Sequence, residues 1–402
     1  MNILTLNGGS STIRFAIFGE ELPLVRRLSG RIEGIGLGQP ILSFHHGDGE
    51  VQVKSDIDAS TEPMAARSLV DWLTDQTVFE NIEVVGHRVV FGASHTQPEW
   101  LTPELLDDLR RASVDDPAHL PGEIALMEAV AARNPALKQW VCFDTAFHSE
   151  MPMVARQLAI PRRYWDRGVR RHGFHGVSYA YLMEELRRLG DPAASAGRVI
   201  LAHLGSGASL AAVLKGESQD TSMGLTTASG LVMSSRSGDL DPGLPALLAR
   251  TDHMTPLQFQ HMVHHESGLL GISETSPDMR ELLAIEARDG RAHQAIELFC
   301  HQTRKWIGAF AAVLGGLDTL VFSGGIGENA PEIRSRICRG LEFLGIELDV
   351  ASNASSGGLI SIPSGRVNVR VIATDEEQMM ARMILRHIGC GQAGPSLPGC
   401  HA

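Results

Sequence analysis

The strongest constraint on the fold is a pattern that occurs twice, about half a chain apart. Residues 2–19 read NILTLNGGSSTIRFAIFG: an apolar strand, a turn of small residues and a second, alternating strand. Residues 199–216 read VILAHLGSGASLAAVLKG and repeat this order. With Asn7 placed opposite Leu204, the residue pairs that match are Ile3 and Ile200, Leu4 and Leu201, Gly8 and Gly205, Ile13 and Leu210, Gly19 and Gly216. The repeat predicts a duplicated α/β domain, with two unrelated β-hairpins as the alternative.

Strands alternate with helices in the rest of the chain. The patterns predict strands at 84–90, 140–143, 319–322 and 367–373, and helices at 103–111, 122–133, 244–250, 296–314, 331–339 and from 374 to about 387. This order predicts mostly parallel or mixed sheets with helices on their faces. Ligands bind such sheets at the carboxyl ends of strands, where Asp144, Gly205 and Gly325 lie. Residues 391–402 have no periodicity and are expected to fray.

Composition narrows the function classes. The chain has 402 residues, 43 % of them hydrophobic, which is enough for two domains. Its formal net charge of −12 argues against a nucleic-acid partner. The sequence holds no apolar run of the ~20 residues that a membrane span needs, and its N-terminus lacks the basic region of a signal peptide. Five scattered cysteines argue against a disulfide framework or a structural zinc site. We therefore expect a cytoplasmic protein with free thiols.

Three short turns of small residues carry the functional signal. They are residues 7–11, 205–209 and 325–329, each directly after an expected strand. Such turns are either plain turns or concavities of backbone N–H groups that bind anions. The arginine pairs 162–163 and 170–171 are likewise either a solvated face or an anion site. No P-loop, no dinucleotide fingerprint at Gly34–Gly38 and no hydrolase G-x-S-x-G motif is present.

The turns belong to a longer series of motifs. The segments are LNGGSSTIRFAIF (6–18), GHRVV (86–90), FDTAFHSEMP (143–152), RRHGFHGVSY (170–179), HLGSGASL (203–210), DTSMGLT (220–226), SSRSGDLDPG (234–243), SGLLGIS (267–273), FSGGIGENAPEIR (322–334) and ATDEEQMMA (373–381). In this order and spacing the sequence resembles the acetate kinases, within the short-chain carboxylate kinases of the sugar kinase–heat-shock-70–actin fold. The resemblance covers nearly the whole chain.

The resemblance implies a fold and an activity. The fold would be two duplicated ribonuclease H-like α/β domains with mixed sheets flanked by helices, and an active site in the cleft between them. Residues 1–147 with 380–402 would form the substrate domain, and residues 148–379 the nucleotide domain. The reaction would be reversible phosphoryl transfer from ATP to acetate, giving ADP and acetyl phosphate. The resemblance also implies a homodimer.

Residue roles follow by motif position. Arg88 would bind the substrate carboxylate, with Val90 and Phe174 beside the acyl group. Asp144, His175 and Arg236 would be the catalytic residues, Asp144 by positioning Arg88 or the metal shell. The residues expected to bind ATP are Arg14, His203, Leu204, Gly205, Ser206, Gly207, Asp278, Met279, Arg280, Gly325, Ile326, Gly327, Glu328 and Asn329. Asn7 and Glu376 would hold Mg²⁺, or Mn²⁺, largely through water. For the acidic run 375–377, an ordinary helix start is the alternative.

The chain departs from the family pattern at several positions. Arg14 stands where lysine is usual, Ser206 where asparagine is usual, Phe91 where histidine is usual, and Asp115 where histidine is usual. The acyl pocket would be lined by Val90, Val114, Phe174 and Thr227, of which 114 and 227 differ from the typical leucine and proline. These changes leave open a preference for propionate or butyrate. They also leave open a non-catalytic regulator that binds ATP.

Overall fold

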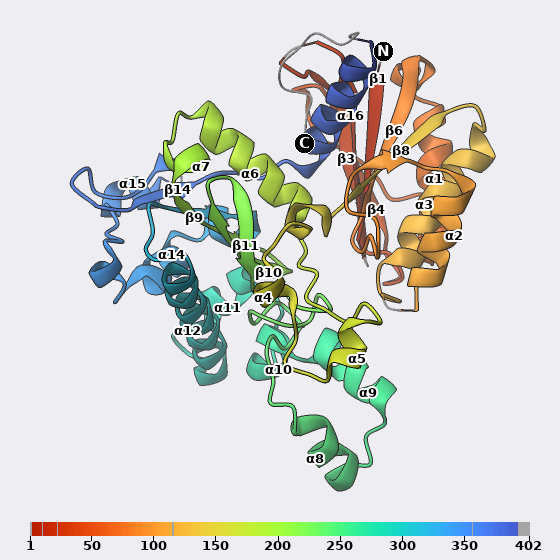
Figure 1. The fold of residues 1–402 in the computed structure, drawn as a ribbon. Coiled ribbons are helices and arrows are strands. Elements are labelled where there is room, and N and C mark those ends of the chain that lie inside the picture. Colours follow the sequence, from red (N-terminus) through yellow and green to blue (C-terminus); the bar gives the residue numbers. More distant parts are fainter. Residues whose placement is uncertain (1, 10, 22, 115, 356, 393–402) are drawn as a thin grey trace. The chain divides into compact units, whose positions relative to one another are not determined.

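The computed structural model describes all residues except 1, 10, 22, 115, 356 and 393–402 (Figure 1). The chain divides into two compact units: residues 1–146 with 375–402, and residues 147–374. We call these unit 1 and unit 2. The second division lies just before the closing helix, which therefore belongs to unit 1 from its first residue. Among the described residues, every helix is too short or too polar to cross a membrane.

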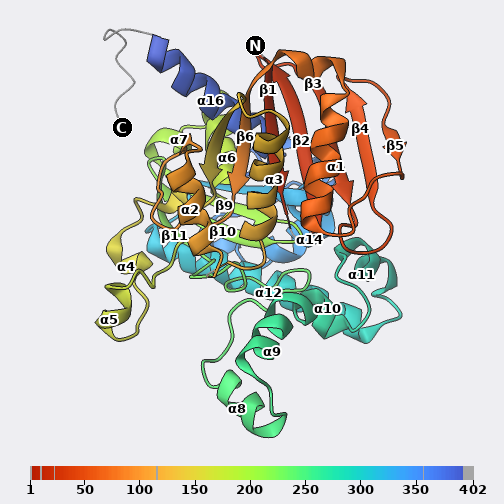
Figure 2. The same cartoon turned by 90° about the vertical axis from the view of Figure 1, so that its right-hand side faces the viewer.

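Unit 1 is built on a mixed sheet of eight strands in the order β5-β4-β3-β2-β1-β6-β8-β7 (Figure 2). The strands are β1 (Asn2–Gly8), β2 (Thr12–Gly19), β3 (Arg26–Glu33), β4 (Ile41–His46), β5 (Gln52–Lys54), β6 (Ile82–Val89), β7 (Glu99–Trp100) and β8 (Lys138–Phe143). Its helices are α1 (Glu62–Thr74), α2 (Pro103–Ala112), α3 (Leu120–Arg133) and α16 (Glu376–Gln392), with a 3₁₀ turn at Thr77–Asn81.

The two faces of this sheet are covered by different helices. Alternate strand residues, such as Leu4 and Leu6, pack with α1 and α3 into one core. The closing helix α16 contacts β1, β2 and β6. At Gly86 a Cβ atom would lie 2.8 Å from Ile384 Cδ1, so the absence of a side chain there lets α16 approach the strand closely.

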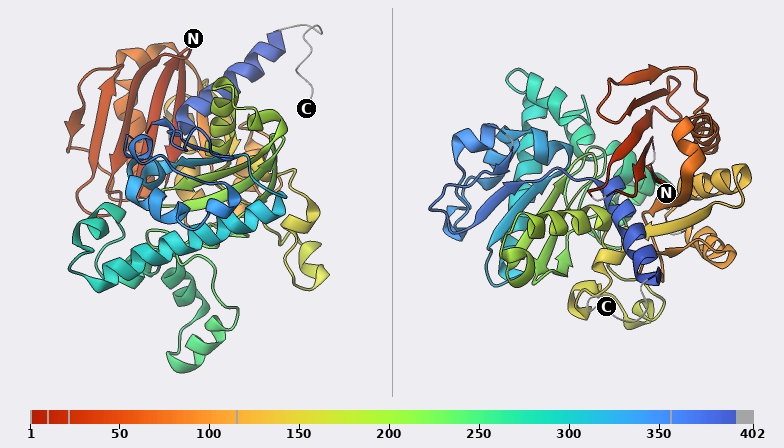
Figure 3. Two further views of the ribbon diagram at one scale, coloured as in Figure 1. Left: turned by 90° about the vertical axis from the view of Figure 1, so that its left-hand side faces the viewer. Right: turned by 90° about the horizontal axis from the view of Figure 1, so that it is seen from above.

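Unit 2 contains a second mixed sheet, in the order β11-β10-β9-β12-β14-β13. The strands are β9 (Arg198–Leu204), β10 (Ala208–Leu214), β11 (Glu217–Thr221), β12 (Thr319–Ser323), β13 (Gly358–Leu359) and β14 (Asn368–Val371). The long helix α12 (Gly290–Val313) runs along this sheet, and α6 (Gly176–Arg188) and α7 (Ala193–Ala196) pack against alternate residues of β9 and β10 (Figure 3, left).

The other helices of unit 2 lie in the segments that connect its strands. The helices of this unit are α4 (Met153–Arg156), α5 (Arg162–Trp165), α6 (Gly176–Arg188), α7 (Ala193–Ala196), α8 (Leu244–Thr251), α9 (Pro256–His261), α10 (Gly268–Ser273), α11 (Met279–Ile285), α12 (Gly290–Val313), α13 (Gly324–Asn329), α14 (Pro331–Cys338) and α15 (Val350–Ala354). A π-helical turn spans Met262–Glu266, and 3₁₀ turns span Ala146–His148 and Glu342–Leu344.

The sheet topology confirms the repeat. In unit 1 the order β3-β2-β1-β6-β8 corresponds to β11-β10-β9-β12-β14 in unit 2. In each case an antiparallel hairpin is followed by parallel strands. Gly8 pairs with Ile13 at the first turn, whereas Leu204 pairs with Ala208 at the second. The second turn is therefore one residue shorter, so a single offset cannot align both strands of the hairpins.

The structure corrects several boundaries. The expected glycine loop 323–329 is the short helix α13, because its glycines start a helical turn directly after β12. Helix α12 begins at Gly290, where Asp289 caps it, and not near 296. Helix α16 continues to Gln392, so the first two residues of the expected frayed tail are helical, and residues 393–402 lie outside the described part. Helices α1 and α6 had no counterpart in the sequence prediction.

The structure describes the surroundings of three of the five cysteines. Cys142, Cys300 and Cys338 are free and buried. Burial raises the pKa of each of these thiols to about 12. They are therefore inert packing residues, in agreement with the expectation of free thiols.

Candidate active site

In unit 1, polar side chains gather at one edge of the sheet. Strands β1, β6 and β8 run parallel. Asn7 lies near the end of β1, Arg88 near the end of β6, and Asp144 directly after β8. Because the carboxyl ends of parallel strands meet at the same edge, three residues distant in sequence become neighbours.

Arg88 is the centre of this group. Its side chain is 12 % exposed, and its Nε and Nη2 donate to Asp144 Oδ2 at 3.0 and 2.5 Å. Its Nη1 donates to Asn7 Oδ1 at 3.2 Å and to the Gly8 carbonyl at 3.4 Å. Burial opposes the charge on Arg88, but the carboxylates of Asp144, Glu376 and Glu123 outweigh it and raise the pKa. Arg88 is therefore a permanently charged and rigidly held cation.

The first turn of α16 adds carboxylates to the group. Asn7 Nδ2 donates to Glu376 Oε2 at 2.7 Å and to Glu377 Oε1 at 3.1 Å. Burial, and next the charge of Glu376, raise the pKa of Glu377, while Arg14 lowers it. Arg14 pairs with Asn7 across β1 and β2, with its side chain exposed. The structure thus brings together five residues that the sequence analysis assigns to the site but cannot place: Asn7, Arg14, Arg88, Asp144 and Glu376.

These donors suit a magnesium ion. The amide oxygen of Asn7 and the carboxylate of Glu376 are hard oxygen ligands, and Mg²⁺ needs few protein ligands when water and phosphate oxygens complete its shell. Within the described part of the chain, no cluster of three or more His, Cys, Asp or Glu side chains could hold a metal ion by itself. The donor set therefore fits a metal bound together with substrate phosphates and does not fit a zinc-type site.

In unit 2, the turn between β9 and β10 is the focus. A Cβ atom placed on Gly207 would lie 3.2 Å from His175 Nε2 and 3.6 Å from Arg236 Nη1. A Cβ on Gly205 would lie 3.8 Å from the Gly325 amide nitrogen. The side chains of His175 and Arg236 and two glycine-rich segments therefore converge on this turn. The arrangement offers backbone N–H groups and positive charge to a phosphate.

His175 is held in an unusual conformation. It precedes α6 with a φ of 59°, a region that non-glycine residues rarely occupy. Its Nδ1 lies 2.8 Å from Ser209 Oγ, which in turn lies 2.5 Å from the Tyr179 hydroxyl. Its ring stacks on that of His203, with centroids 4.4 Å apart. Strained backbone at a polar site of this kind is characteristic of functional residues.

Arg236 lies on a loop that α10 and the π-helical turn hold in place. Backbone hydrogen bonds join Ser237 N to the Val263 carbonyl at 3.0 Å and Leu269 N to the Met233 carbonyl at 2.8 Å. Gly268 has a φ of +62°, and a Cβ there would lie 2.7 Å from the Arg236 carbonyl oxygen. The close approach of the two backbones fixes where the Arg236 side chain starts.

The match to known proteins decides the family. The model of the acetokinase family matches residues 2–382. The chain belongs to the acetokinase family. It is 42 % identical to the acetate kinase of Rhodopseudomonas palustris strain TIE-1 over 391 residues, which is 96 % of this chain and 98 % of that protein. It is also 42 % identical to the acetate kinase of Methylocella silvestris over 397 residues, 95 % of this chain and 97 % of that protein.

Solved acetokinase-family structures share the fold. A crystal structure of Porphyromonas gingivalis acetate kinase matches with a TM-score of 0.86 and 33 % identity, covering 96 % of this chain and 99 % of that one. A propionate kinase from Francisella tularensis matches with a TM-score of 0.88 and 35 % identity, covering 95 % and 98 %. The duplicated α/β fold predicted for this chain is therefore confirmed.

Apart from Arg14, which lies in unit 1, the residues expected to bind ATP lie in unit 2, and several of their polar groups bond to the protein itself. Glu328 Oε1 accepts from Gly324 N at 2.8 Å and from Thr374 N at 3.1 Å, so this carboxylate binds the protein's own backbone. Asp278 caps α11 and pairs with the exposed Arg280 at 2.5 Å. His203 Nδ1 lies 2.9 Å from Ser178 Oγ. Their roles in binding ATP stay predictions.

Arg334 is a buried residue that the sequence analysis missed. It is completely buried, and its Nη1 donates to the carbonyls of Gly327 and Glu328 at 2.8 and 2.9 Å. Its Nε and Nη2 donate to Asn353 Oδ1 and to the Asn353 carbonyl at 2.8 and 2.6 Å. It therefore satisfies the last carbonyls of α13 and fixes the segment 325–329. An arginine in a helix of mixed polarity gave no signal of this.

The acyl-pocket expectations have mixed outcomes. Val90 and Phe174 are 2 % and 3 % exposed, in units 1 and 2 respectively, and Thr227 is 7 % exposed. Val114, by contrast, is 85 % exposed, so its side chain lies outside the core of unit 1. It follows the last turn of α2. The prediction that Asp115 replaces a family histidine lies outside the described residues.

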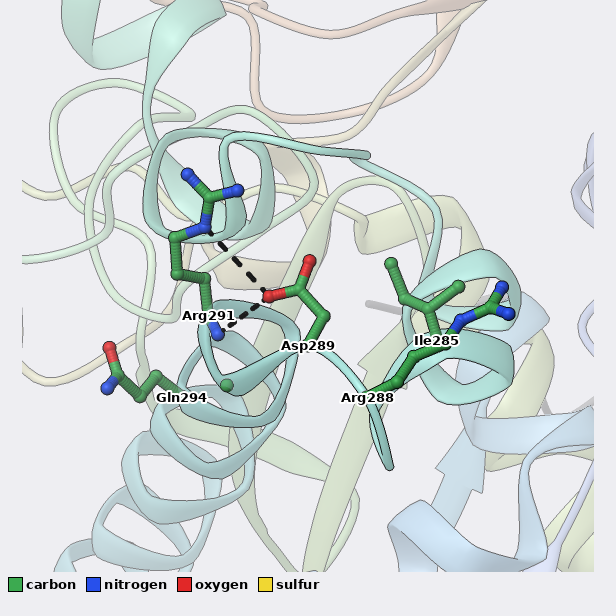
Figure 4. A pocket seen from close by; sticks show the side chains of 6 residues that line it. Ile285, Arg288, Asp289, Arg291 and Gln294 are labelled. Atoms are coloured by element: carbon green, nitrogen blue, oxygen red, sulfur yellow. Dashed lines mark hydrogen bonds and ion pairs between the residues drawn. The ribbon is translucent and has the colours of Figure 1, made fainter.

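A pocket of about 610 Å³ lies elsewhere in unit 2, at the junction of α11 and α12 (Figure 4). It is lined by Ile285, Arg288, Asp289, Gly290, Arg291 and Gln294. The Asp289 carboxylate points toward Arg291 and accepts from the Arg291 backbone at 2.9 Å, as the cap of α12. None of the residues predicted for the active site lines this pocket.

His148 supports the turn that carries His175. Its Nε2 donates to the Phe174 carbonyl at 3.1 Å, and its Nδ1 accepts from Ser218 Oγ at 2.8 Å. Burial is the main cause that lowers the pKa of His148 to about 4, and the charge of Arg171 acts in the same direction. The folded protein therefore needs His148 neutral.

We expect a loss of stability in weak acid because of His148. Its folded pKa of about 4 lies below the ordinary value of 6.5, so its contribution is full above pH 6.5 and is lost as the pH falls to about 4. A shift of this size is worth about 3 kcal/mol. Urea denaturation at pH 7 and pH 4.5 should show a smaller loss for His148→Gln than for the wild type. Equal losses in both proteins would contradict the assignment; His261→Gln, at an exposed histidine, is the control.

Proposed function

We propose that this chain transfers the terminal phosphoryl group of ATP to the carboxylate of acetate, giving ADP and acetyl phosphate, and that it catalyses the reverse reaction. Membership of the acetokinase family makes it a phosphotransferase with a carboxyl acceptor. The observation that carries the assignment to this site is the Arg88–Asp144 pair, a buried cation at the carboxyl edge of a sheet.

The acid needs no base. Carboxyl groups have ordinary pKa values near 4, so a small carboxylate is ionised at pH 7 and can attack phosphorus directly. Asp144 instead orients Arg88, since both Nε and Nη2 of the guanidinium bond to it. The remaining N–H capacity of Arg88 would bind the substrate carboxylate, and Val90 and Phe174 would contact its alkyl group.

Phosphoryl transfer leaves little covalent work for the protein. The charge that develops lies on the oxygens of the moving group, where positive and N–H donors lower the barrier. Arg236 Nη1 and His175 Nε2, both beside Gly207, would supply these donors. If Tyr179 donates to Ser209 and Ser209 donates to Nδ1 of His175, then Nε2 carries the proton and can donate it in a hydrogen bond.

Asn7 and Glu376 would hold the divalent cation, Mg²⁺ or Mn²⁺, which neutralises charge on the nucleotide phosphates when bound. Arg14 would approach the same phosphates. ATP would lie along residues 203–207, 278–280 and 325–329. The reaction then requires the acid on Arg88 and the phosphoryl group at 205–207 to come within bonding distance. A homodimer and a cytoplasmic location are part of the proposal; the first rests on the family resemblance, and the second on the sequence features described above.

A propionate preference is the second candidate. The propionate kinase from Francisella tularensis matches this chain as well as the acetate kinases of known structure do. Because one methylene in a pocket changes discrimination by only about 1–3 kcal/mol, the two activities can coexist in one protein.

The test is formation of acyl phosphate. The purified protein is incubated with ATP and acetate, propionate or butyrate, with Mg²⁺, Mn²⁺ or EDTA, and the product is trapped as hydroxamate. We expect product with either metal, none with EDTA, and none with an Arg88→Ala variant. The ratio among the acids decides the preferred chain length. If no acid gives product while ATP still binds, the protein is a regulator and the proposed function is wrong.

A further inference from the structure

Glu123 is a buried carboxyl group in unit 1 that the sequence analysis did not select. It lies in the first turn of α3, where acidic residues are common because they favour the N-terminus of a helix. Its side chain is only 2 % exposed, however, so it is not the usual solvated carboxylate. A carboxyl group buried this deeply requires specific partners.

Its contacts lead to the segments around Arg88. Both oxygens of Glu123 accept a hydrogen bond from the backbone N–H of Val90, at 3.1 and 3.2 Å. Val90 follows the last residue of β6 and lies two positions after Arg88. A Cβ on Gly8 would lie 3.6 Å from Glu123 Cγ, and the Gly8 carbonyl accepts from Arg88. Glu123 therefore packs between the two chain segments that frame the Arg88 guanidinium.

Electrostatic interactions also link Glu123 to Arg88. The carboxyl groups of Asp144, Glu376 and Glu123 raise the pKa of Arg88. Asp144 is bound to it directly, and Glu376 lies 3.7 Å from Nε. Burial is the main cause that raises the pKa of Glu123 well above its ordinary value; the charge of Arg88 lowers it, and those of Asp116 and Asp144 raise it further. The two hydrogen bonds of Glu123 go to the backbone of Val90, a predicted acyl-pocket residue.

We propose that Glu123 is a positioning residue for the substrate acid: it fixes the backbone at Val90, two residues after the Arg88 guanidinium. The proposal rests on the proposed function, because it takes Arg88 and Val90 as the site of the acid. Glu123 itself does not touch the reacting atoms. It sets the position of the pocket wall relative to the cation that binds the carboxylate.

Two substitutions separate its contributions. Glu123→Gln keeps an oxygen that can accept from the Val90 N–H but cannot ionise. Glu123→Leu has no acceptor and leaves the buried Val90 N–H without its partner, which is costly. The matched control is Glu128→Gln on the same helix, whose carboxylate pairs with Arg110 at the surface. KM for acetate, KM for ATP and kcat are measured for all four proteins.

We expect Glu123→Leu to raise KM for acetate at least tenfold and to leave KM for ATP within twofold. Glu123→Gln should give a KM for acetate close to that of the wild type, because its amide oxygen can still accept from the Val90 N–H. The proposal is overturned if Glu123→Gln raises KM for acetate as much as Glu123→Leu. It is also overturned if Glu123→Leu changes both KM values equally or neither.

Two further measurements remove ambiguity. Hydrogen exchange of the Val90 amide should be slow in the wild type and in Glu123→Gln. Fast exchange in these two proteins would contradict the hydrogen bond from Val90 to residue 123. This test does not require Glu123→Leu to fold. Acetate binding by calorimetry separates this proposal from the reaction. If the wild type makes no acyl phosphate, the proposed function fails, but Glu123 is still decided by whether Glu123→Gln retains acetate binding. Absence of acetate binding in the wild type overturns both.

Discussion

An Arg88→Lys protein is expected to lose about a thousandfold or more in kcat/KM for acetate, with KM for ATP changed little. Lysine keeps the charge but not the planar fork that donates from Nε and Nη2 to Asp144 and from Nη1 to Asn7 and Gly8. A single ammonium group cannot satisfy Asp144 and bind a carboxylate in the same geometry. The rates come from the hydroxamate assay with acetate varied at saturating ATP.

The control for this change is Arg110→Lys, because Arg110 makes two ion pairs at the surface of α2 and should leave the kinetics unchanged. Arg88→Ala should in addition lower the free energy of unfolding by about 3–5 kcal/mol, since Asp144 is completely buried and would lose its partner. If the Arg88→Lys protein has a KM and kcat for acetate near those of the wild type, Arg88 does not bind the substrate acid as proposed.

Arg236→Ala is expected to lower kcat by about 10³–10⁵, the range measured when a charge-stabilising arginine is removed from phosphoryl-transfer enzymes. The reason is its place beside Gly207, next to His175 Nε2, where the moving phosphoryl group would lie. ADP and ATP affinities should change much less, because the charge that Arg236 meets develops mainly during transfer. Single-turnover rates and nucleotide binding by calorimetry check the two statements separately.

Arg250→Ala is a suitable control, since Arg250 lies exposed in the last turn of α8. It should not change kcat. A loss of nucleotide affinity in Arg236→Ala as large as its loss of kcat would assign Arg236 to ground-state binding. A kcat within tenfold of the wild type would exclude it from the transfer step.

Local sequence patterns were sufficient for the fold class. The two strand–turn–strand units are visible because alternation of apolar residues and small-residue turns are encoded within a few positions. The same holds for β6, β8, β12 and α2, each found within two residues of its structural bounds. The prediction of a loop at 323–329 was wrong for the opposite reason. A glycine-rich run has no strong local preference for one backbone conformation, and packing after β12 makes it helical.

The site shows the same division. Arg88, Asp144, His175 and Arg236 could be selected from the sequence because each lies in a motif that resembles a family pattern. What sequence could not give is the set of partners that hold them. His148 and Ser209 support the turn and ring of His175, Arg334 fixes the end of α13, and Glu123 binds Val90.

The sequence by itself therefore determined the duplicated fold and the family and selected the main residues of the candidate site, because these depend on short patterns and on residue type. The tertiary structure alone decided which polar groups are buried and which group satisfies each of them. Glu123 and Glu128 lie on one helix and look alike in sequence, yet one is buried on a backbone amide and the other is exposed. Burial and pairing depend on contacts between residues far apart in the chain. These contacts decide whether the folded protein stabilises or destabilises a charged side chain.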